Sequence, residues 1–124
     1  MSELVYKDEA YEIVGVCMEV YNELGPGLLE IIYKDALEWE LDIRFIQYER
    51  EKEYPVYYKG HLLRRKFNAD FIMYDKILLE VKAKESLCNE DIAQTINYVK
   101  LSGCKLGLLI NFGRTKLEVK RLVF

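Results

Sequence analysis

The segment FNADFIMYDKILLEVKA, residues 67–83, restricts the fold more than any other part of the sequence. Two apolar stretches, 67–74 and 77–83, flank the polar pair Asp75-Lys76, and this pattern is typical of a β-hairpin. A sheet built on this hairpin is expected to be covered by flanking helices.

The neighbouring segments supply that cover. Residues 8–24 place apolar side chains at helical spacing and glutamates on the other side, and Gly25-Pro26 ends this helix. A second helix is expected from about residue 28 to 41. A third is expected to begin with Asn89 as its N-cap and to stop at Gly103. The apolar run 106–112, LGLLINF, predicts a strand buried on both faces, which makes the third helix a crossover connection.

Shorter strands are predicted between the second helix and the hairpin, where the hydrophobic period is two. They are expected at 45–49, 53–58 and 62–66, with Lys59-Gly60 as a turn, and an edge strand is expected at 117–124. The order α, α, antiparallel strands, α, β, β predicts an α/β (or α+β) domain with a mixed sheet flanked by helices. A length of 124 residues favours one domain over residues 1–124.

Composition excludes several classes of protein. The chain is 51% hydrophobic and 31% charged, which is typical of globular rather than disordered proteins. No apolar run approaches the roughly 18 residues of a membrane span, and the first residues lack the apolar core of a secretory signal. Cys17, Cys88 and Cys104 are too widely spaced for a zinc knuckle and odd in number. They favour a reducing cytoplasm over a disulfide framework.

Charge is distributed unevenly. Residues 1–58 contain 5 Lys/Arg and 14 Asp/Glu, whereas residues 59–124 contain 13 and 7. A basic second half is compatible with a surface for a polyanion. It is equally compatible with two solvated faces that attract each other, so charge alone leaves both interpretations open.

Charged residues inside the apolar hairpin are the strongest functional signal. Asp70, Glu80 and Lys82 occupy strands that are otherwise apolar, and a buried charge is costly unless it is paired or binds a metal. Glu80 and Lys82 share one face of their strand. Two carboxylates bind a hard divalent cation, and a lysine beside it can position water or stabilise charge on a phosphate. The alternative is a plain ion pair at the edge of a sheet.

The register of the hairpin tests the catalytic interpretation. A strict two-residue turn at Asp75-Lys76 places Asp70 opposite Val81, on the wrong face for Glu80. The catalytic interpretation therefore predicts a bulge or a three-residue connection, with Asp70 opposite Lys82 and Ile72 opposite Glu80.

Other candidate residues have simpler alternatives. Glu30 lies in the first turn of a helix, where an acid is also favoured by the helix dipole. Gln94 and Tyr98 are four residues apart and so share a helical face. The simpler alternative is that this face is exposed to solvent and has no role in a site. His61 is the only histidine, so a histidine-based dyad or zinc site has no basis, and no P-loop or GxSxG motif is present.

The chain resembles the GxxExxY family in its order of motifs from about Tyr11 to Phe124. The signature itself matches Gly27-Leu28-Leu29-Glu30-Ile31-Ile32-Tyr33. Further matching segments are YPVYYKG, NADFIMYD, ILLEVKA, QTINYVKLSG and KLGLLINF. That family is placed in the PD-(D/E)XK nuclease-like superfamily. The resemblance implies a restriction-endonuclease-like core, α-β-β-β-α-β, with an extra N-terminal helix.

The resemblance also implies roles for individual residues. Asp70 and Glu80 correspond to the metal-binding acids, Lys82 to the motif lysine and Glu30 to an additional helix acid. Gln94 and Tyr98 resemble a QxxxY feature, and Ala69 replaces the leading proline of the motif. The expected function is a Mg²⁺- or Mn²⁺-dependent nuclease, acting on DNA more readily than RNA. The expected phosphate contacts are Arg64, Arg65, Lys66 and Lys84.

An alternative function is kept beside the nuclease. The same fold can act as an inactive module that binds nucleic acid or a protein. A homodimer formed through the edge strand 117–124, or a protein partner, is compatible with either function.

Overall fold

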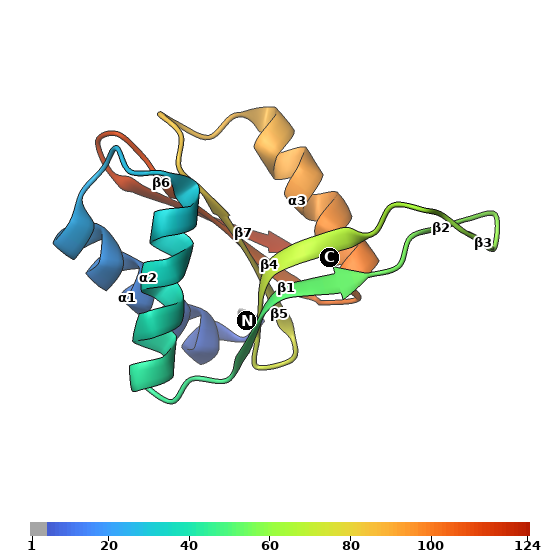
Figure 1. The fold of residues 1–124 in the computed structure, drawn as a ribbon, viewed down its shortest axis with the longest axis horizontal. Helices are drawn as coiled ribbons and strands as arrows, with labels where there is room; N and C mark the ends of the chain where they lie inside the picture. The colour runs from blue at the N-terminus through green and yellow to red at the C-terminus, as the bar shows by residue number, and fades with distance from the viewer. Residues whose placement is uncertain (1–4) are drawn as a thin grey trace, which may run out of the picture.

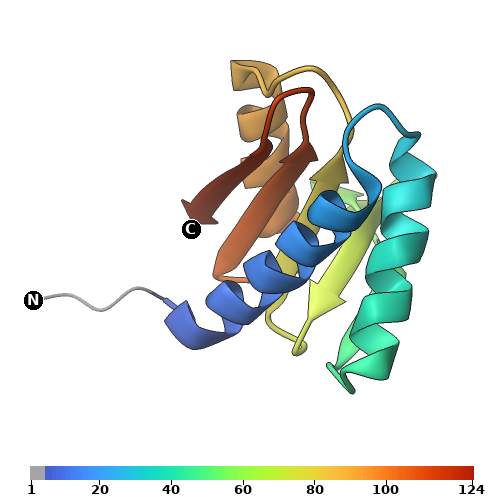
Figure 2. The ribbon, with the colours of Figure 1, turned by 90° about the vertical axis from the view of Figure 1, so that its left-hand side faces the viewer.

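A computed structural model describes residues 5–124 and shows a five-stranded sheet with helices on both faces (Figures 1 and 2). The strand order is β1-β4-β5-β6-β7, and all neighbours are antiparallel except the parallel pair β5 and β6. The strands are β1 (Tyr48–Tyr54), β4 (Phe67–Met73), β5 (Ile77–Lys82), β6 (Leu106–Phe112) and β7 (Leu117–Val123). The predicted mixed sheet flanked by helices is confirmed.

Two helices cover one face of the sheet and a third covers the other. Helices α1 (Lys7–Leu24) and α2 (Glu30–Ile43) lie together, as Figure 2 shows, and α3 (Asn89–Ser102) lies on the opposite side. Helix α3 joins β5 to β6, so the predicted crossover between parallel strands is confirmed. No helix among residues 5–124 combines the length and hydropathy needed to cross a bilayer.

The start of α3 differs from the prediction by one residue. Cys88, rather than Asn89, is the N-cap, because the carboxylate of Asp91 accepts a hydrogen bond from the Cys88 amide at 2.9 Å. At the other end Gly103 adopts φ 75°, the left-handed conformation expected for a residue that ends a helix.

The strands before the hairpin also differ from the prediction. Segments 45–49 and 53–58 were expected as separate strands, but β1 is a single strand from Tyr48 to Tyr54. Phe45 lies in the preceding loop with φ 54° and is 95% exposed. The polar middle of β1 continues the strand because it pairs with β4 throughout most of its length. Segment 62–66 contributes only its first residue to a strand, β3 (His61–Leu62), which pairs with β2 (Tyr57–Tyr58).

The β4–β5 hairpin has the three-residue connection that the catalytic interpretation requires. Met73 pairs with Ile77, so Tyr74, Asp75 and Lys76 form the loop. The detailed pairing predicted for it is wrong, since Ile72 pairs with Leu78 and not with Glu80. A longer loop moves the partner of each β4 residue one position towards the turn. Continued by one residue, this register sets Asp70 across from Glu80 rather than Lys82.

The side chains of β1 and β4 switch from one face of the sheet to the other at the midpoint of each strand. Phe67 and Ala69 pack in the cluster beneath α3, whereas Phe71 and Met73 pack beneath α1 and α2. Side chains that are two apart normally share a face, so the alternation is broken at Asp70. On β1, Tyr48 and Tyr54 lie on opposite faces in the same way, and the midpoint is Glu51, with φ 55°.

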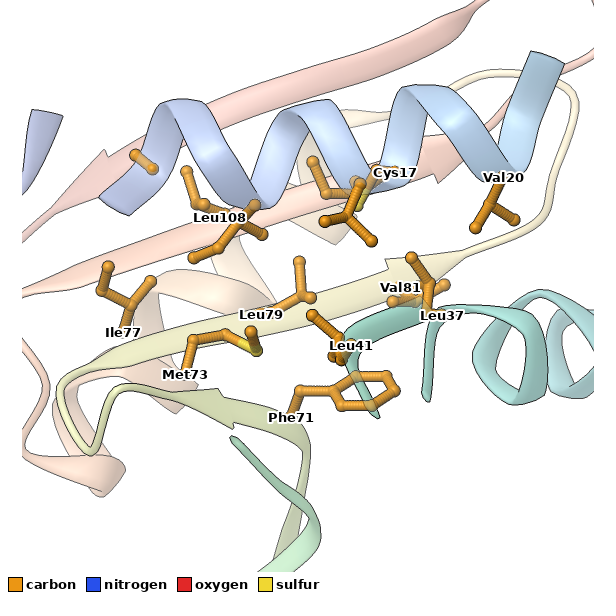
Figure 3. Packing of buried hydrophobic residues seen from close by; sticks show 14 of the residues in the cluster. Cys17, Val20, Leu37, Leu41, Phe71, Met73, Ile77, Leu79, Val81 and Leu108 are labelled. Atoms are coloured by element: carbon orange, nitrogen blue, oxygen red, sulfur yellow. The ribbon is translucent and has the colours of Figure 1, made fainter. Parts of the chain in front are cut away.

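Pairing of the two strands is interrupted at this midpoint. The pairs Arg50–Phe71 and Lys52–Ala69 are present, and no pair joins Glu51 to Asp70. The core beneath α1 and α2 lies beside this unpaired position. There Leu37 and Leu41 of α2 face the Phe71 and Leu79 side chains (Figure 3). Asp70 therefore lies where two strands pass from one layer of the protein to the other.

Candidate active site

Two carboxylates take the place of ladder hydrogen bonds between β4 and β5. The Asp70 amide donates to Glu80 Oε2 at 2.9 Å, and the Val81 amide donates to Asp70 Oδ2 at 2.8 Å. The regular ladder ends at the pair Phe71–Leu79. Asp70 and Glu80, which the sequence singled out together, are thus brought together: the Glu80 carboxylate accepts from the Asp70 amide, and the Asp70 carboxylate accepts from the amide of the residue after Glu80.

A buried lysine neutralises the acids on the α2 side. Lys34 is 7% exposed, and its Nζ lies 2.6 Å from Asp70 Oδ1, 3.3 Å from Glu51 Oε1 and 3.4 Å from Glu30 Oε2. Burial by itself lowers the pKa of a lysine. The ion pair with Asp70, followed by attraction to Glu51 and Glu30, raises the pKa of Lys34 above its ordinary value. Lys34 is therefore a stable cation.

Glu80 has the opposite character. Its side chain is 6% exposed, and burial followed by the negative charge of Asp70 raises the pKa of Glu80 to about 8. The Asp70 amide and the ammonium groups of Lys82 and Lys34 counter part of that effect. At neutral pH, and without an added cation, the Glu80 carboxyl therefore favours its protonated form.

Three further predicted residues gather around Glu80 on the α3 side. Lys82 Nζ donates to Gln94 Oε1 at 3.3 Å, which links β5 to α3. The Tyr98 ring stacks on Phe67 with centroids 4.0 Å apart. Burial, followed by the charges of Glu80 and Asp70, raises the pKa of Tyr98 above its usual value.

Glu30 is connected to the acid pair only through Lys34. Its side chain is 44% exposed at the start of α2, and the Lys34 ammonium separates it from Asp70. Among residues 5–124, no three His, Cys, Asp or Glu side chains have the spacing of a metal site. Two carboxylates alone still offer the oxygen ligands that a hard divalent cation prefers. Asp70 and Glu80 therefore fit such a cation, whereas the full three-acid set does not in this arrangement.

The predicted phosphate contacts fall into two groups. Arg64, Arg65 and Lys66 follow one another between β3 and β4 and are all exposed. Lys84 lies apart, with its Nζ 2.8 Å from Asp91 Oδ2, so it stabilises the start of α3. Burial opposes ionisation of Asp91, but Lys84 and the Cys88 amide lower the pKa of Asp91 to about 2.

The sequence reasoning missed Lys34 and Glu51. A signal for Lys34 was present, because it lies four residues after Glu30 and directly between Tyr33 and Leu37 in an apolar stripe. A lysine at such a position needs a buried partner. Glu51 had no comparable signal, since it alternates normally with its neighbours and only its backbone conformation distinguishes it.

Comparison with known proteins was informative for the family and the fold. The sequence model of a protein family described as the PD-(D/E)XK nuclease superfamily matches residues 7–122. A solved structure titled "Crystal structure of SSO0001" superposes with a TM-score of 0.59 at 21% sequence identity. The match covers 95% of this chain and 59% of that one, so the chain spans less than two thirds of that protein. A search of curated proteins gave no match.

Proposed function

Because this chain belongs to the PD-(D/E)XK nuclease superfamily, we propose that it is a Mg²⁺- or Mn²⁺-dependent nuclease that hydrolyses phosphodiester bonds, in DNA more readily than in RNA. Membership of the superfamily suggests nuclease activity and a nucleic-acid substrate. The observation that carries the proposal is the Asp70–Glu80 pair, whose carboxylates bind each other's strand in place of the sheet ladder.

The proposed metal ligands are Asp70 and Glu80. A divalent cation bound there would polarise the scissile phosphate and lower the pKa of a bound water. Lys82 then orients the attacking water or stabilises charge on the phosphate, and Gln94 holds its ammonium in place at 3.3 Å. Tyr98 closes the α3 side of the site and excludes solvent from the acids.

Lys34 is proposed as a positioning residue. Its ammonium binds Asp70 Oδ1 and leaves Oδ2 on the Val81 amide, which fixes the plane of this carboxylate. Glu30 and Glu51 hold the ammonium from the other side. We keep Glu30 in the proposed site as the acid that orients Lys34. If the Lys34 ammonium moves away, Glu30 would be free to bind a second metal ion.

Cleavage assays test this proposal directly. Single- and double-stranded DNA and RNA are incubated with Mg²⁺ or Mn²⁺ and either the unmodified protein, Asp70→Asn or Glu80→Gln. Loss of a preorganised ionic group in an active site typically costs about a hundredfold or more in rate. Glu85→Gln is the matched control, because that glutamate is exposed and pairs with Arg114 at the surface. Full activity in Asp70→Asn or in Glu80→Gln would refute the site.

A module without catalysis is the second candidate. The observation that favours it is Lys34, which already neutralises Asp70 without a metal. The two functions differ in their response to divalent cations. A nuclease with metal ligands is stabilised by Mg²⁺ or Mn²⁺ in proportion to binding, whereas a module without a metal site has an unchanged melting temperature.

Finer assignments belong to the same proposal. The segment 27–33 supports membership of the GxxExxY family, and the free thiols Cys17, Cys88 and Cys104 support the cytoplasm. We treat residues 1–124 as one nuclease domain. Strand β7 occupies a sheet edge and supports pairing with a second copy or with another protein. Sedimentation of the protein over a range of concentrations checks the dimer.

A further inference from the structure

The β2–β3 hairpin and the segment after it form an arm, residues 57–66, that projects beyond the sheet (Figure 1). Lys59 and Gly60 form its turn with φ 50° and 74°, the left-handed pair that a tight hairpin uses. Every residue of the arm is exposed. A two-stranded ribbon alone is marginally stable in water. Because the residues of the arm are exposed, packing against the core does not account for the arm.

Aromatic rings occur on both faces of the arm. Tyr57 pairs with Leu62 and Tyr58 pairs with His61, and cross-strand partners share a face. The two tyrosines are 61% and 60% exposed. Flat rings offered to solvent on both sides of a thin ribbon are suited to stacking with unpaired bases, which have π-faces of their own.

The charge of the arm differs from that of the whole chain. Residues 55–69 contain no acidic side chain, whereas the full sequence has a net charge of −3. Lys59 lies near the tip, and Arg64, Arg65 and Lys66 lie at the base. Basic residues interleaved with aromatic ones are the pattern of a single-strand binding surface. There the phosphates of the nucleic acid contact the basic side chains and the bases stack on the aromatic rings.

A cavity lies at the base of the arm, next to one residue of the candidate site. It has a volume of about 370 Å³ and includes Arg65, Lys66 and Tyr98 in its lining. Tyr98 belongs to the candidate site. Lys66 directly precedes β4 and is four residues from Asp70, which corresponds to roughly 13 Å of extended strand. A strand held by the arm would therefore reach the acid pair within a few nucleotides.

We propose that the arm binds a single-stranded segment of nucleic acid beside the site. Bases stack on Tyr57 and Tyr58, and the phosphates contact Arg64 and Arg65. This inference rests on the proposed function, because it names the form of substrate that the same site would receive.

The test measures binding without cleavage. Fluorescence anisotropy in EDTA compares a labelled single-stranded 20-mer with a blunt duplex of the same sequence. The double variant Y57A/Y58A should weaken single-strand binding by about tenfold or more, since each stacked base contributes substantially. Tyr11→Ala is the matched control, because that tyrosine is 83% exposed on α1 and should leave binding unchanged. Thermal melting of each variant checks that the sheet remains folded.

A second pair of variants tests the charges. R64Q/R65Q should reduce the slope of log affinity against log salt by roughly 1.4, the value for two phosphate contacts on a single strand. K116Q/K120Q removes two exposed charges beside β7 and should affect the slope less. Unchanged binding in Y57A/Y58A, tighter binding to the duplex, or no binding of either oligonucleotide by the unmodified protein would overturn the inference.

The two proposals fail in different ways. If the protein cleaves nucleic acid in the presence of metal but Y57A/Y58A binds single strands normally, the arm inference is wrong and the nuclease proposal stands. Tyrosine-dependent binding without cleavage under any metal condition supports the arm and removes the nuclease.

Discussion

The face of the sheet beneath α1 and α2 and the face beneath α3 differ in how many apolar side chains they bury. The larger buried cluster lies beneath α1 and α2 and draws on both helices and on strands β4, β5 and β6 (Figure 3). The smaller cluster is Phe67, Ala69, Ile72, Leu78, Val99 and Cys104. The candidate site and the arm open towards the α3 side, where less apolar surface is buried. Stability is therefore concentrated on one face, whereas the candidate site lies where the two faces meet, with Lys34 on the α2 side and Gln94 on the α3 side.

The largest effect is expected from the core beneath α2. Leu37 is fully buried against the sheet, so Leu37→Ala should lower the free energy of unfolding by about 3 kcal/mol through lost burial and a cavity. Urea denaturation measures this. Cleavage per folded molecule should remain close to that of the unmodified protein. A loss of activity larger than the loss of folded protein would contradict the separation of the two faces.

Lys34 tests the point where the two faces meet. Lys34→Met leaves Asp70, Glu51 and Glu30 without their shared cation, and we expect a loss of about 2 kcal/mol. Added Mg²⁺ should recover part of this stability, because a divalent cation can replace the missing positive charge. Arg44→Met is the control. It removes a surface ion pair with Glu40 and should lower the free energy of unfolding by less than about 1 kcal/mol. Equal losses in both variants would show that Lys34 is only a surface ion pair.

Close packing of α3 gives the next effect. A Cβ on Gly107 of β6 would lie 2.4 Å from Val99 Cγ2, so Gly107→Ala should destabilise the fold by about 1–2 kcal/mol. Val99→Ala in the same molecule should relieve the clash, and the two changes should be strongly non-additive. Thermal melting of the two single variants and the double variant measures this coupling. Simple additivity would mean that α3 shifts freely on the sheet.

Glu80 makes stability depend on pH. Because its pKa is raised from 4.5 to about 8, the folded protein retains a proton that the unfolded chain has lost. Its stabilising contribution is therefore complete below pH 4.5 and is lost as the pH rises towards 8. In EDTA, the stability of Glu80→Gln should equal that of the unmodified protein at low pH and exceed it near pH 9. Parallel stability curves across this range would contradict the raised pKa.

The smallest effect on stability is expected in the arm. Tyr57→Ala and Tyr58→Ala remove rings that contact no core cluster, so each should change the free energy of unfolding by less than about 0.5 kcal/mol. Denaturation curves should overlay that of the unmodified protein. A clear loss of stability would mean that the arm packs on the body of the protein and is not available for a ligand.

Much of the fold was predictable because hydrophobic period and turn residues act locally. The expected helices, the hairpin and strand β6 lie within about two residues of their predicted bounds. The α-β-β-β-α-β core with an extra N-terminal helix, expected from the resemblance, is confirmed by the superposition and the sheet order. The change of face at Glu51 and Asp70 was not predictable, since it depends on how two distant strands twist together.

The strongest signal for the candidate site in the residues themselves was a charge inside an apolar strand, whereas Glu30, Gln94 and Tyr98 depended on the resemblance to a family. Asp70, Glu80 and Lys82 carried that signal, and the structure brings the two acids together. The signal for Lys34 was weaker, since it was only a lysine beside apolar helix positions, and its burial depends on contacts with three acids. The roles of these residues in catalysis remain predictions for the assays described above.

The crossing of β1 and β4 has a consequence for how the protein matures. Lys34 reaches Asp70 from one helical layer, and Gln94 and Tyr98 approach from the other, so neither layer alone assembles the site. A newly made chain in which a single layer has docked would hold only part of the proposed site. If the chain is the nuclease proposed above, hydrolysis would begin only after both layers have docked, and partly folded copies would leave nucleic acid intact.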